Sequence, residues 1–144
     1  MVLRMIVKIS DSTLCKAIRR TSEVSTESGG ILVGKLKDGD LIIDGLETGQ
    51  QSATHVHVIL HDEFLVEVAM KYAEREEKIV GWYHSHPKMG CFMSSTDIDT
   101  QRRYQALFSD AVALVIDPQR PIFRFYRIED TNYITVEYDV FENL

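Results

Sequence analysis

His84-Ser85-His86, followed by Ser94 and Asp97, is the run of this chain that is best suited to chemistry. Two histidines one residue apart on a strand point to the same face of a sheet. Asp97 offers a carboxylate oxygen at the start of the next expected helix. Two imidazole nitrogens and one carboxylate, with a fourth position left for water, form the ligand set of a catalytic rather than a structural zinc. The sequence therefore predicts one zinc ion per chain, held by His84, His86 and Asp97.

A zinc site of this kind also needs a side chain that moves protons. Zinc lowers the pKa of its bound water towards about 7 and polarises a carbonyl, but a general base must take the water's proton and return it to the leaving amine. Asp97 is needed as a ligand, and Asp99 would point elsewhere on a helix. The candidate lies upstream at Glu27, before Gly29 and Gly30, which favour close approach of the backbone.

These two motifs resemble the JAMM, or MPN-plus, family of zinc metalloproteases. The family signature is His-x-His, seven residues, Ser, two residues and Asp, and residues 84–97 match it at every fixed position. The second element of the family, Glu-x-x-Gly-hydrophobic-x-hydrophobic-Gly, is matched by residues 27–34. The resemblance implies the ligands named above, Glu27 as the general acid/base that holds the zinc water, and Ser94 as a hydrogen-bond donor to the oxyanion of the transition state.

The resemblance covers roughly residues 5–128 and is deeper than the minimal signatures. The segments Gly81-Trp82-Tyr83 and Asp97-Ile98-x-Thr100-Gln101 are similar to the isopeptidase subunits of the proteasome lid and the signalosome. Ser25 stands where many members have proline. With 144 residues the chain lacks room for the long C-terminal extensions of the eukaryotic subunits, so we expect a compact, stand-alone version like those of archaea and bacteria.

The activity that the resemblance implies is hydrolysis of the amide bond after the C-terminal Gly-Gly of a ubiquitin-like modifier joined to lysine. Met89, Cys91, Phe92 and Met93 follow the histidines and are the candidate substrate-binding residues, because an apolar loop there would bind an extended peptide. Two alternatives stay open. One is removal of residues that follow the Gly-Gly of a sulfur-carrier protein. The other is a non-catalytic MPN scaffold, which typically loses ligands or the glutamate.

Several neighbouring features have plainer interpretations. His55-Val56-His57 lacks a serine and an aspartate at matching distances, so it is interpreted as the wet face of a strand. Cys91 has no free base nearby, since both histidines are committed to metal, and is interpreted as a loop residue that shapes the site. Ser94 could also cap the next helix, which is compatible with its other role. Trp82 is expected to pack in the core and to lie beside no ligand.

The composition sets the class of protein. Hydrophobic residues make up 44% of the chain and charged residues 26%, as in a soluble globular protein of one domain, residues 1–144. The net charge of −6 disfavours nucleic acid and anionic membranes as partners. The two cysteines are too few for a disulfide framework, and no signal peptide is recognisable, so we expect a cytoplasmic protein. MPN domains often pair, and a homodimer is possible.

The hydrophobic pattern predicts short strands interleaved with three helices. Strands are expected over residues 5–9, 31–36, 41–47, 54–61, 79–84, 111–116, 122–127 and 132–140. Helices are expected from Ser10 or Ser12 to the Gly29-Gly30 pair, over about 62–77, and over about 95–108. The prediction is a mixed α/β (α+β) fold with a central sheet flanked by about three helices. The resemblance implies the MPN/JAMM, cytidine-deaminase-like version of it, with a mixed, mostly antiparallel sheet.

Overall fold

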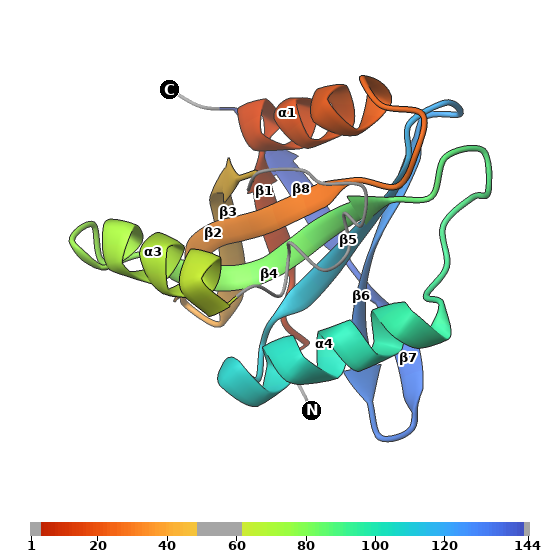
Figure 1. The fold of residues 1–144 in the computed structure, drawn as a ribbon. Helices are drawn as coiled ribbons and strands as arrows, with labels where there is room; N and C mark the ends of the chain where they lie inside the picture. The colour runs from red at the N-terminus through yellow and green to blue at the C-terminus, as the bar shows by residue number, and fades with distance from the viewer. Residues whose placement is uncertain (1–3, 49–61, 143–144) are drawn as a thin grey trace.

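The computed structural model describes residues 4–48 and 62–142, in which eight strands form one sheet and three helices pack on it (Figure 1). The elements in chain order are β1 (Val7–Ser10), α1 (Asp11–Ser22), β2 (Gly29–Lys37), β3 (Asp40–Glu47), α3 (Asp62–Ala73), β4 (Lys78–Ser85), α4 (Ser95–Leu107), β5 (Val112–Asp117), β6 (Ile122–Glu129), β7 (Asn132–Val136) and β8 (Tyr138–Phe141). The predicted mixed α+β fold is confirmed. The predicted strand over 54–61, with His55 and His57, lies outside the described residues.

The strand order in the sheet is β7-β6-β5-β4-β2-β3-β1-β8. The sheet is mixed, because β4 runs antiparallel to β2 but parallel to β5, and β1 runs parallel to both β3 and β8. Strand β4 therefore lies in the middle of the sheet, between β2 and β5. This placement matters because β4 ends in His84 and Ser85, and His86 follows it directly.

The sheet is curled, and one prediction is wrong for that reason. The single strand expected over residues 132–140 is two strands, β7 and β8, which occupy opposite ends of the strand order. Only Glu137 separates them, and its carbonyl accepts a hydrogen bond from the amide of Val7 at 2.9 Å. Adjacent strands lie about 4.8 Å apart, so one residue can join the two edges only if the sheet bends round on itself.

Side chains alternate between the two faces of the sheet and build separate cores. In β5, Val112, Leu114 and Ile116 pack in a cluster that includes Leu14 and Ala17 of α1. Ala113 and Val115 point to the other face and pack in a cluster that includes Tyr104 of α4. Figure 1 accordingly shows α1 well separated from α3 and α4. The histidines of β4 project to the face that α4 covers.

The helix termini follow local sequence signals. Ser10 caps α1, since its side chain accepts a hydrogen bond from the amide of Thr13 at 3.2 Å. Helix α3 was expected to continue to residue 77, and this is wrong, because it ends at Ala73. The amides of Arg75 and Glu77 turn back to the carbonyl of Tyr72, and Glu76 adopts a left-handed φ of 58°, which stops a helix. None of the described helices is both long and apolar enough to span a bilayer.

Candidate metal centre

The end of strand β4, which places the two histidines, is tightly packed. The ring of Trp82 stacks on the ring of His84 with centroids 5.0 Å apart, and its indole Nε1 donates a hydrogen bond to Oε1 of Gln101 at 2.8 Å. Gln101 belongs to α4 and is fully buried. The prediction that Trp82 packs in the core is confirmed. The prediction that it lies beside no ligand is wrong, because residues 82 and 84 share one face of the strand.

Asp97 is placed by the start of α4. Ser94 is the N-cap: its side chain accepts the amide of Asp97 at 3.1 Å, and its own amide donates to Oδ2 of Asp97 at 3.0 Å. This reciprocal capping box fixes the rotation of the first helical turn and points the Asp97 carboxylate back towards the strand. The spacing Ser-x-x-Asp thus caps the start of α4 and also places the Asp97 carboxylate against the histidines.

The three side chains converge below the surface. Oδ1 of Asp97 lies 3.1 Å from Nε2 of His84, and Oδ2 lies 3.1 Å from Nε2 of His86. All three residues are at most 2% exposed. Burial by itself would raise the pKa of the Asp97 carboxyl, but contact with both histidines holds that pKa well below its usual range. The carboxylate is therefore ionised and available to a cation.

The ring nitrogens of the histidines fit a metal. Within the described part of the chain, Nδ1 and Nε2 of His84 and Nδ1 of His86 have no hydrogen-bond partner, although all are buried. Oδ1 of Asp97 is close to Nε2 of His84 without forming an aligned hydrogen bond. Two ligands of a tetrahedral zinc lie roughly 3.3 Å apart when the metal–ligand bonds are about 2.0–2.1 Å. The 3.1 Å separations match that edge, so His84, His86 and Asp97 could hold zinc.

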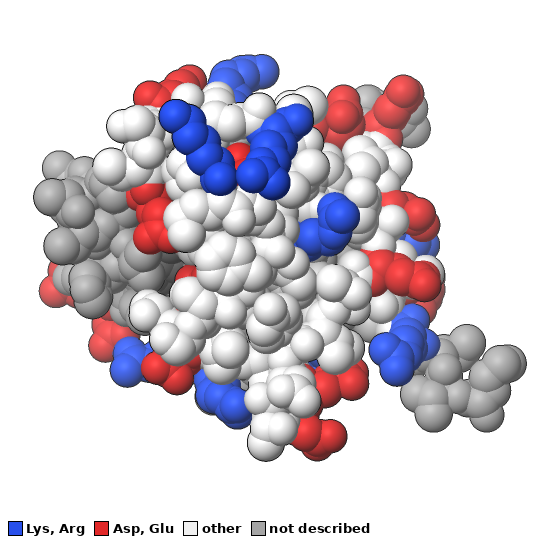
Figure 2. All heavy atoms as spheres, turned by 90° about the vertical axis from the view of Figure 1, so that its right-hand side faces the viewer, with Lys and Arg blue, Asp and Glu red and all other residues white. Residues whose placement is uncertain are grey.

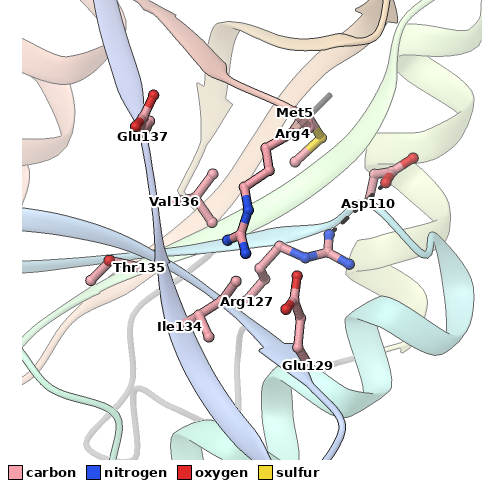
Figure 3. A pocket seen from close by; sticks show the side chains of 9 residues that line it. All are labelled: Arg4, Met5, Asp110, Arg127, Glu129, Ile134, Thr135, Val136 and Glu137. Atoms are coloured by element: carbon pink, nitrogen blue, oxygen red, sulfur yellow. Dashed lines mark ion pairs between the residues drawn. The ribbon is translucent and has the colours of Figure 1, made fainter. Parts of the chain in front are cut away.

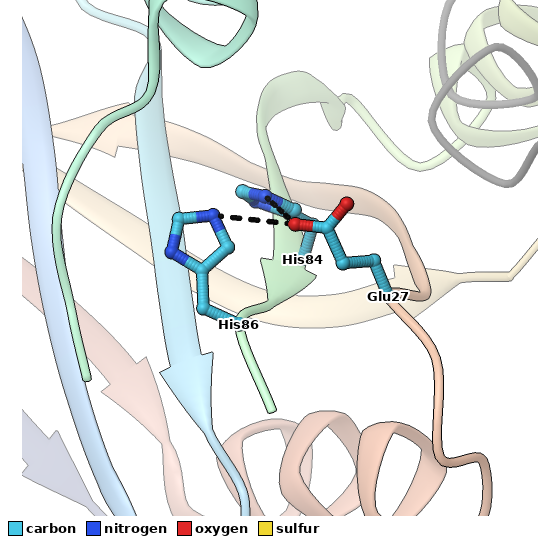
Figure 4. A group of neighbouring side chains, drawn as sticks. All are labelled: Glu27, His84 and His86. Carbon is cyan, nitrogen blue, oxygen red and sulfur yellow. Dashed lines mark ion pairs between the residues drawn. The ribbon is translucent and has the colours of Figure 1, made fainter. Parts of the chain in front are cut away.

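The carboxylate of Glu27 points towards the rings of His84 and His86 (Figure 4). Its Oε1 is 3.6 Å from Nε2 of His86 and 4.0 Å from Nε2 of His84, and one ligand atom of each residue lies within 4.8 Å of the others. These separations exceed the tetrahedral edge, whereas those of Asp97 do not. The side chain of Glu27 is 47% exposed. An exposed carboxylate next to buried ligands is suited to exchange protons with water rather than to close a structural site.

The loop that follows the histidines is held at two points. Asp117, fully buried at the end of β5, accepts the amides of Lys88 at 3.1 Å and Gly90 at 2.8 Å. Burial opposes ionisation of this carboxyl, but the backbone amides that it accepts lower its pKa. The thiol of Cys91 donates to the carbonyls of Val115 and Ile122, and burial raises its pKa, so it remains a neutral thiol.

The four candidate substrate-binding residues differ in where they point. Met89 is 61% exposed at the top of the loop, and Phe92 packs on the ring of His86 with centroids 4.4 Å apart. Cys91 is anchored inward as described above. Met93 is 5% exposed and belongs to the core between the sheet and α4. Met89 and Phe92 are thus the two that the loop presents next to the metal ligands.

Two residues that hydrogen-bond the segments next to this site were missed from the sequence. Asp117 anchors the loop, and its only local signal is a carboxylate at the end of a buried strand, before Pro118. Ser85 binds the backbone of Ser28, which follows Glu27 in the chain. No local pattern predicts either contact, because each joins segments that are far apart in the sequence.

A hollow of about 750 Å³ lies elsewhere on the molecule (Figure 3). It opens between the segment Arg4-Met5 and the strands β6 and β7 and shares no residue with the metal cluster. Arg4 and Arg127 line it together with Asp110, Glu129 and Glu137, and Arg127 pairs with Asp110 at 3.9 Å. This mixture of charges favours neither an anionic nor a cationic ligand.

The fold and the site together define the class of protein, an MPN-like α+β domain with a histidine–carboxylate metal cluster. The solved structure of protein DSY2949 from Desulfitobacterium hafniense has the same fold, with a TM-score of 0.77 over 96% of this chain and 95% of that chain at 16% identity. The family model described as JAB1/Mov34/MPN/PAD-1 ubiquitin protease matches residues 5–109. This chain therefore belongs to the JAB/MPN family, as the motifs predicted.

Among the curated relatives are proteins named as subunits of the 26S proteasome and of the COP9 signalosome. The chain is 38% identical over 117 residues to the 26S proteasome regulatory subunit RPN11 of Eremothecium gossypii, and 36% identical over 118 residues to the ubiquitin carboxyl-terminal hydrolase RPN11 of Saccharomyces cerevisiae. It is 38% identical over 128 residues to the COP9 signalosome complex subunit 5b of Arabidopsis thaliana. These matches cover 78%, 78% and 81% of this chain but only 38%, 38% and 34% of the relatives.

Proposed function

We propose that this protein is a zinc-dependent isopeptidase that hydrolyses the amide bond after the C-terminal Gly-Gly of a ubiquitin-like modifier attached to lysine. The observation that carries the proposal is the convergence of buried His84, His86 and Asp97 beneath the exposed Glu27. The relatives support the substrate class, since one of them is named a ubiquitin carboxyl-terminal hydrolase. Some members of such families are inactive, but the two histidines and two carboxylates that lie together here support an active site.

In this proposal three residues bind the zinc ion and a fourth residue transfers the proton. Zinc bound by His84, His86 and Asp97 would lower the pKa of a coordinated water and polarise the scissile carbonyl. Glu27 takes a proton from the attacking water and delivers it to the nitrogen of the leaving lysine, so water supplies both the new carboxyl oxygen and the amine proton. Because water is the nucleophile, no covalent bond forms between the enzyme and the modifier.

Ser94 is assigned to the oxyanion that develops on the carbonyl oxygen. Its Oγ accepts the amide of Asp97, and a serine hydroxyl that accepts one bond keeps its own proton to donate. The capping interaction therefore orients the hydroxyl without consuming it as a donor. A preorganised donor of this kind costs no reorganisation when the charge forms.

The modifier's tail is proposed to lie along the loop of residues 87–93. Met89 is exposed there, and Phe92 covers the ring of His86. Cys91 and Met93 support the loop from below through their buried contacts. The face that carries this loop, on the right of Figure 1, is largely uncharged at its centre (Figure 2). An uncharged surface suits a flexible glycine-rich tail, which has no side chains to pair with charges.

The test is a cleavage assay with two substrates, a ubiquitin-like modifier joined to lysine and the same modifier with a linear peptide extension. We expect cleavage of the lysine conjugate by the zinc-loaded protein and its loss with a chelator. Cleavage of the linear extension alone would instead favour the processing of a sulfur-carrier protein. A protein that binds no zinc and cleaves neither substrate would be a scaffold. The cytoplasmic location, the single domain and the homodimer remain predictions.

A further inference from the structure

Ser85 lies between the two histidines in the sequence, but its side chain contacts the residue that precedes β2. Side chains alternate along β4, so its side chain does not share the face of His84 and His86. It is fully buried and thus touches neither solvent nor an incoming substrate. Its contacts are with Ser28, the residue that follows Glu27 and precedes β2.

The hydroxyl of Ser85 completes the last pairing between β2 and β4. The amide of Ser85 donates to the carbonyl of Ser28 at 2.9 Å, and the amide of Ser28 donates to Oγ of Ser85 at 3.1 Å. In a regular antiparallel pair the second acceptor is a backbone carbonyl. Here β4 turns towards β5, where the amide of His86 donates to the carbonyl of Ile116 at 2.8 Å. The side chain of Ser85 accordingly takes the place of the carbonyl.

The position of Glu27 depends on this pairing. Its side chain is 47% exposed, and the contacts found for it among the described residues are those with the two ring nitrogens. The hydroxyl of Ser28 is buried and has no hydrogen-bond partner in the described part of the chain. Ser28 is therefore held by its backbone rather than by its side chain.

We propose that Ser85 is a positioning residue: its hydroxyl fixes the backbone of Ser28 and so holds the Glu27 carboxylate over the two histidines. The inference rests on the proposed function, in which Glu27 transfers the proton. Without the hydroxyl, the buried amide of Ser28 lacks its acceptor, and the segment shifts to find another. A misplacement of about 1 Å costs on the order of 100-fold in rate. We expect Ser85→Ala to lower kcat about 10- to 100-fold, with KM and zinc content unchanged.

The experiment compares Ser85→Ala, Ser85→Thr, Glu27→Gln and the double variant Ser85→Ala/Glu27→Gln in single-turnover cleavage of the lysine conjugate. Threonine keeps the hydroxyl and is expected to restore most of the rate. Because Ser85 acts through Glu27, its replacement should have little further effect once the glutamate has been replaced. Amide hydrogen exchange of Ser28 in the metal-free protein supplies a readout without activity, and we expect it to be at least about 10-fold faster in Ser85→Ala.

Ser10→Ala is the matched control. Ser10 is also fully buried and also accepts a backbone amide, that of Thr13, but it lies on β1. Its replacement should lower Tm and leave both kcat and the exchange of Ser28 unchanged. Should Ser85→Ala not fold, Ser85→Cys keeps the volume and offers only a weak acceptor, and it is expected to behave in the same way.

The possible outcomes separate this inference from the proposed function. An unchanged kcat in Ser85→Ala would overturn the positioning role, and so would an equal loss of rate with and without the Glu27→Gln substitution. An unchanged exchange rate of Ser28 would overturn it as well, whatever the activity. If the wild type itself shows no cleavage that a chelator removes, the proposed function fails, and Ser85 is then only a structural contact.

Discussion

At the scale of single residues, Glu27 differs from the metal ligands in its exposure. The proposed ligands are at most 2% exposed, whereas the side chain of Glu27 is 47% exposed and lies 3.6 and 4.0 Å from the ring nitrogens, farther than Asp97 at 3.1 Å. This difference in exposure agrees with the proposed roles, in which the buried residues hold a metal and Glu27 exchanges protons. Substitutions of the two kinds of residue should therefore differ in their effect on zinc content.

We expect Glu27→Gln to keep zinc and to lower kcat by about 100- to 10,000-fold, the usual contribution of a general acid/base. Zinc content by elemental analysis and kcat for the lysine conjugate are the two measurements. Glu23→Gln, at an exposed glutamate at the end of α1, is the control and should match the wild type. If Glu27→Gln remained fully active, the assignment of the base would be wrong.

Ser94 has a structural and a proposed chemical role, and one variant tests both. Ser94→Ala removes the N-cap of α4, which should cost about 1 kcal/mol of stability. It also removes the proposed oxyanion donor, which should lower kcat by about 100-fold. Thermal unfolding and kcat report the two effects separately. A fall in Tm with an unchanged kcat would leave Ser94 as a cap alone.

At the scale of elements, the loop of residues 87–93 is ordered by β5 and by the turn after it. Asp117 binds the amides of Lys88 and Gly90 with different oxygens. Asparagine has one oxygen and would turn an NH₂ group towards one of these donors. We expect Asp117→Asn to raise KM several-fold, to lower Tm and to retain zinc.

Two companion variants sharpen that test. Met89→Ala removes the exposed side chain of the loop without touching its anchors and should raise KM with little change in kcat. Asp110→Asn alters an acid near the sheet edge that pairs with Arg127, and it should change neither parameter. Equal KM values for wild type, Asp117→Asn and Met89→Ala would show that the substrate does not follow this loop.

Glu77, which precedes β4, lies against Asp44 of β3. The protonated carboxyl of Glu77 donates a hydrogen bond to the Asp44 carboxylate, and this raises the pKa of Glu77 from 4.5 to about 7. The folded state then binds this proton more tightly than the unfolded state, so the stabilisation is complete below about pH 4.5 and is lost as the pH rises through about 7. Glutamine carries no proton to lose in this range. We therefore expect the Tm of Glu77→Gln minus the Tm of the wild type to increase from about pH 4.5 to pH 8, measured in metal-free protein.

The partner residue provides the check on this pH effect. Asp44→Asn removes the hydrogen-bonding carboxyl, so it should reduce the pH dependence by a similar amount, and the double variant should add little more. A constant Tm difference between Glu77→Gln and wild type across this range would contradict the raised pKa of Glu77.

At the scale of the whole molecule, a bound metal would join α4 to β4 and the residue after it, which otherwise meet through the Trp82–Gln101 hydrogen bond and the contacts of Asp97 with the two histidines. A ligand that binds only the folded state stabilises it by about 2.7 kcal/mol at 100 times its Kd. We therefore expect a chelator to lower the Tm of the wild type by several degrees. The Tm of His84→Ala should not respond to the chelator, and an equal response in both proteins would place the metal elsewhere.

Much of this molecule could be predicted from local patterns. The strand that carries the histidines, the Asp38-Gly39 hairpin and the cap at Ser94 each depend on residues within one or two turns or on strict alternation. The wrong predictions of element boundaries concern segments in which the local pattern and the tertiary packing favour different structures. Helix α3 ends at Ala73 although its composition continues to favour a helix, and residues 132–140 divide between two sheet edges because the sheet curls.

The sequence by itself determined the candidate site: the identity of the proposed ligands, their spacing and the presence of a glutamate near two glycines. Periodicity places His84 and His86 on one face, and helix geometry places Ser94 and Asp97 in one turn, so these relations need no tertiary information. Only the tertiary structure decided that Glu27 reaches the histidines, and that Ser85 and Asp117 hold the segments on either side of them. Those contacts depend on the order of the strands, which places β2 and β5 on the two sides of β4, and strand order is a property of the whole sheet.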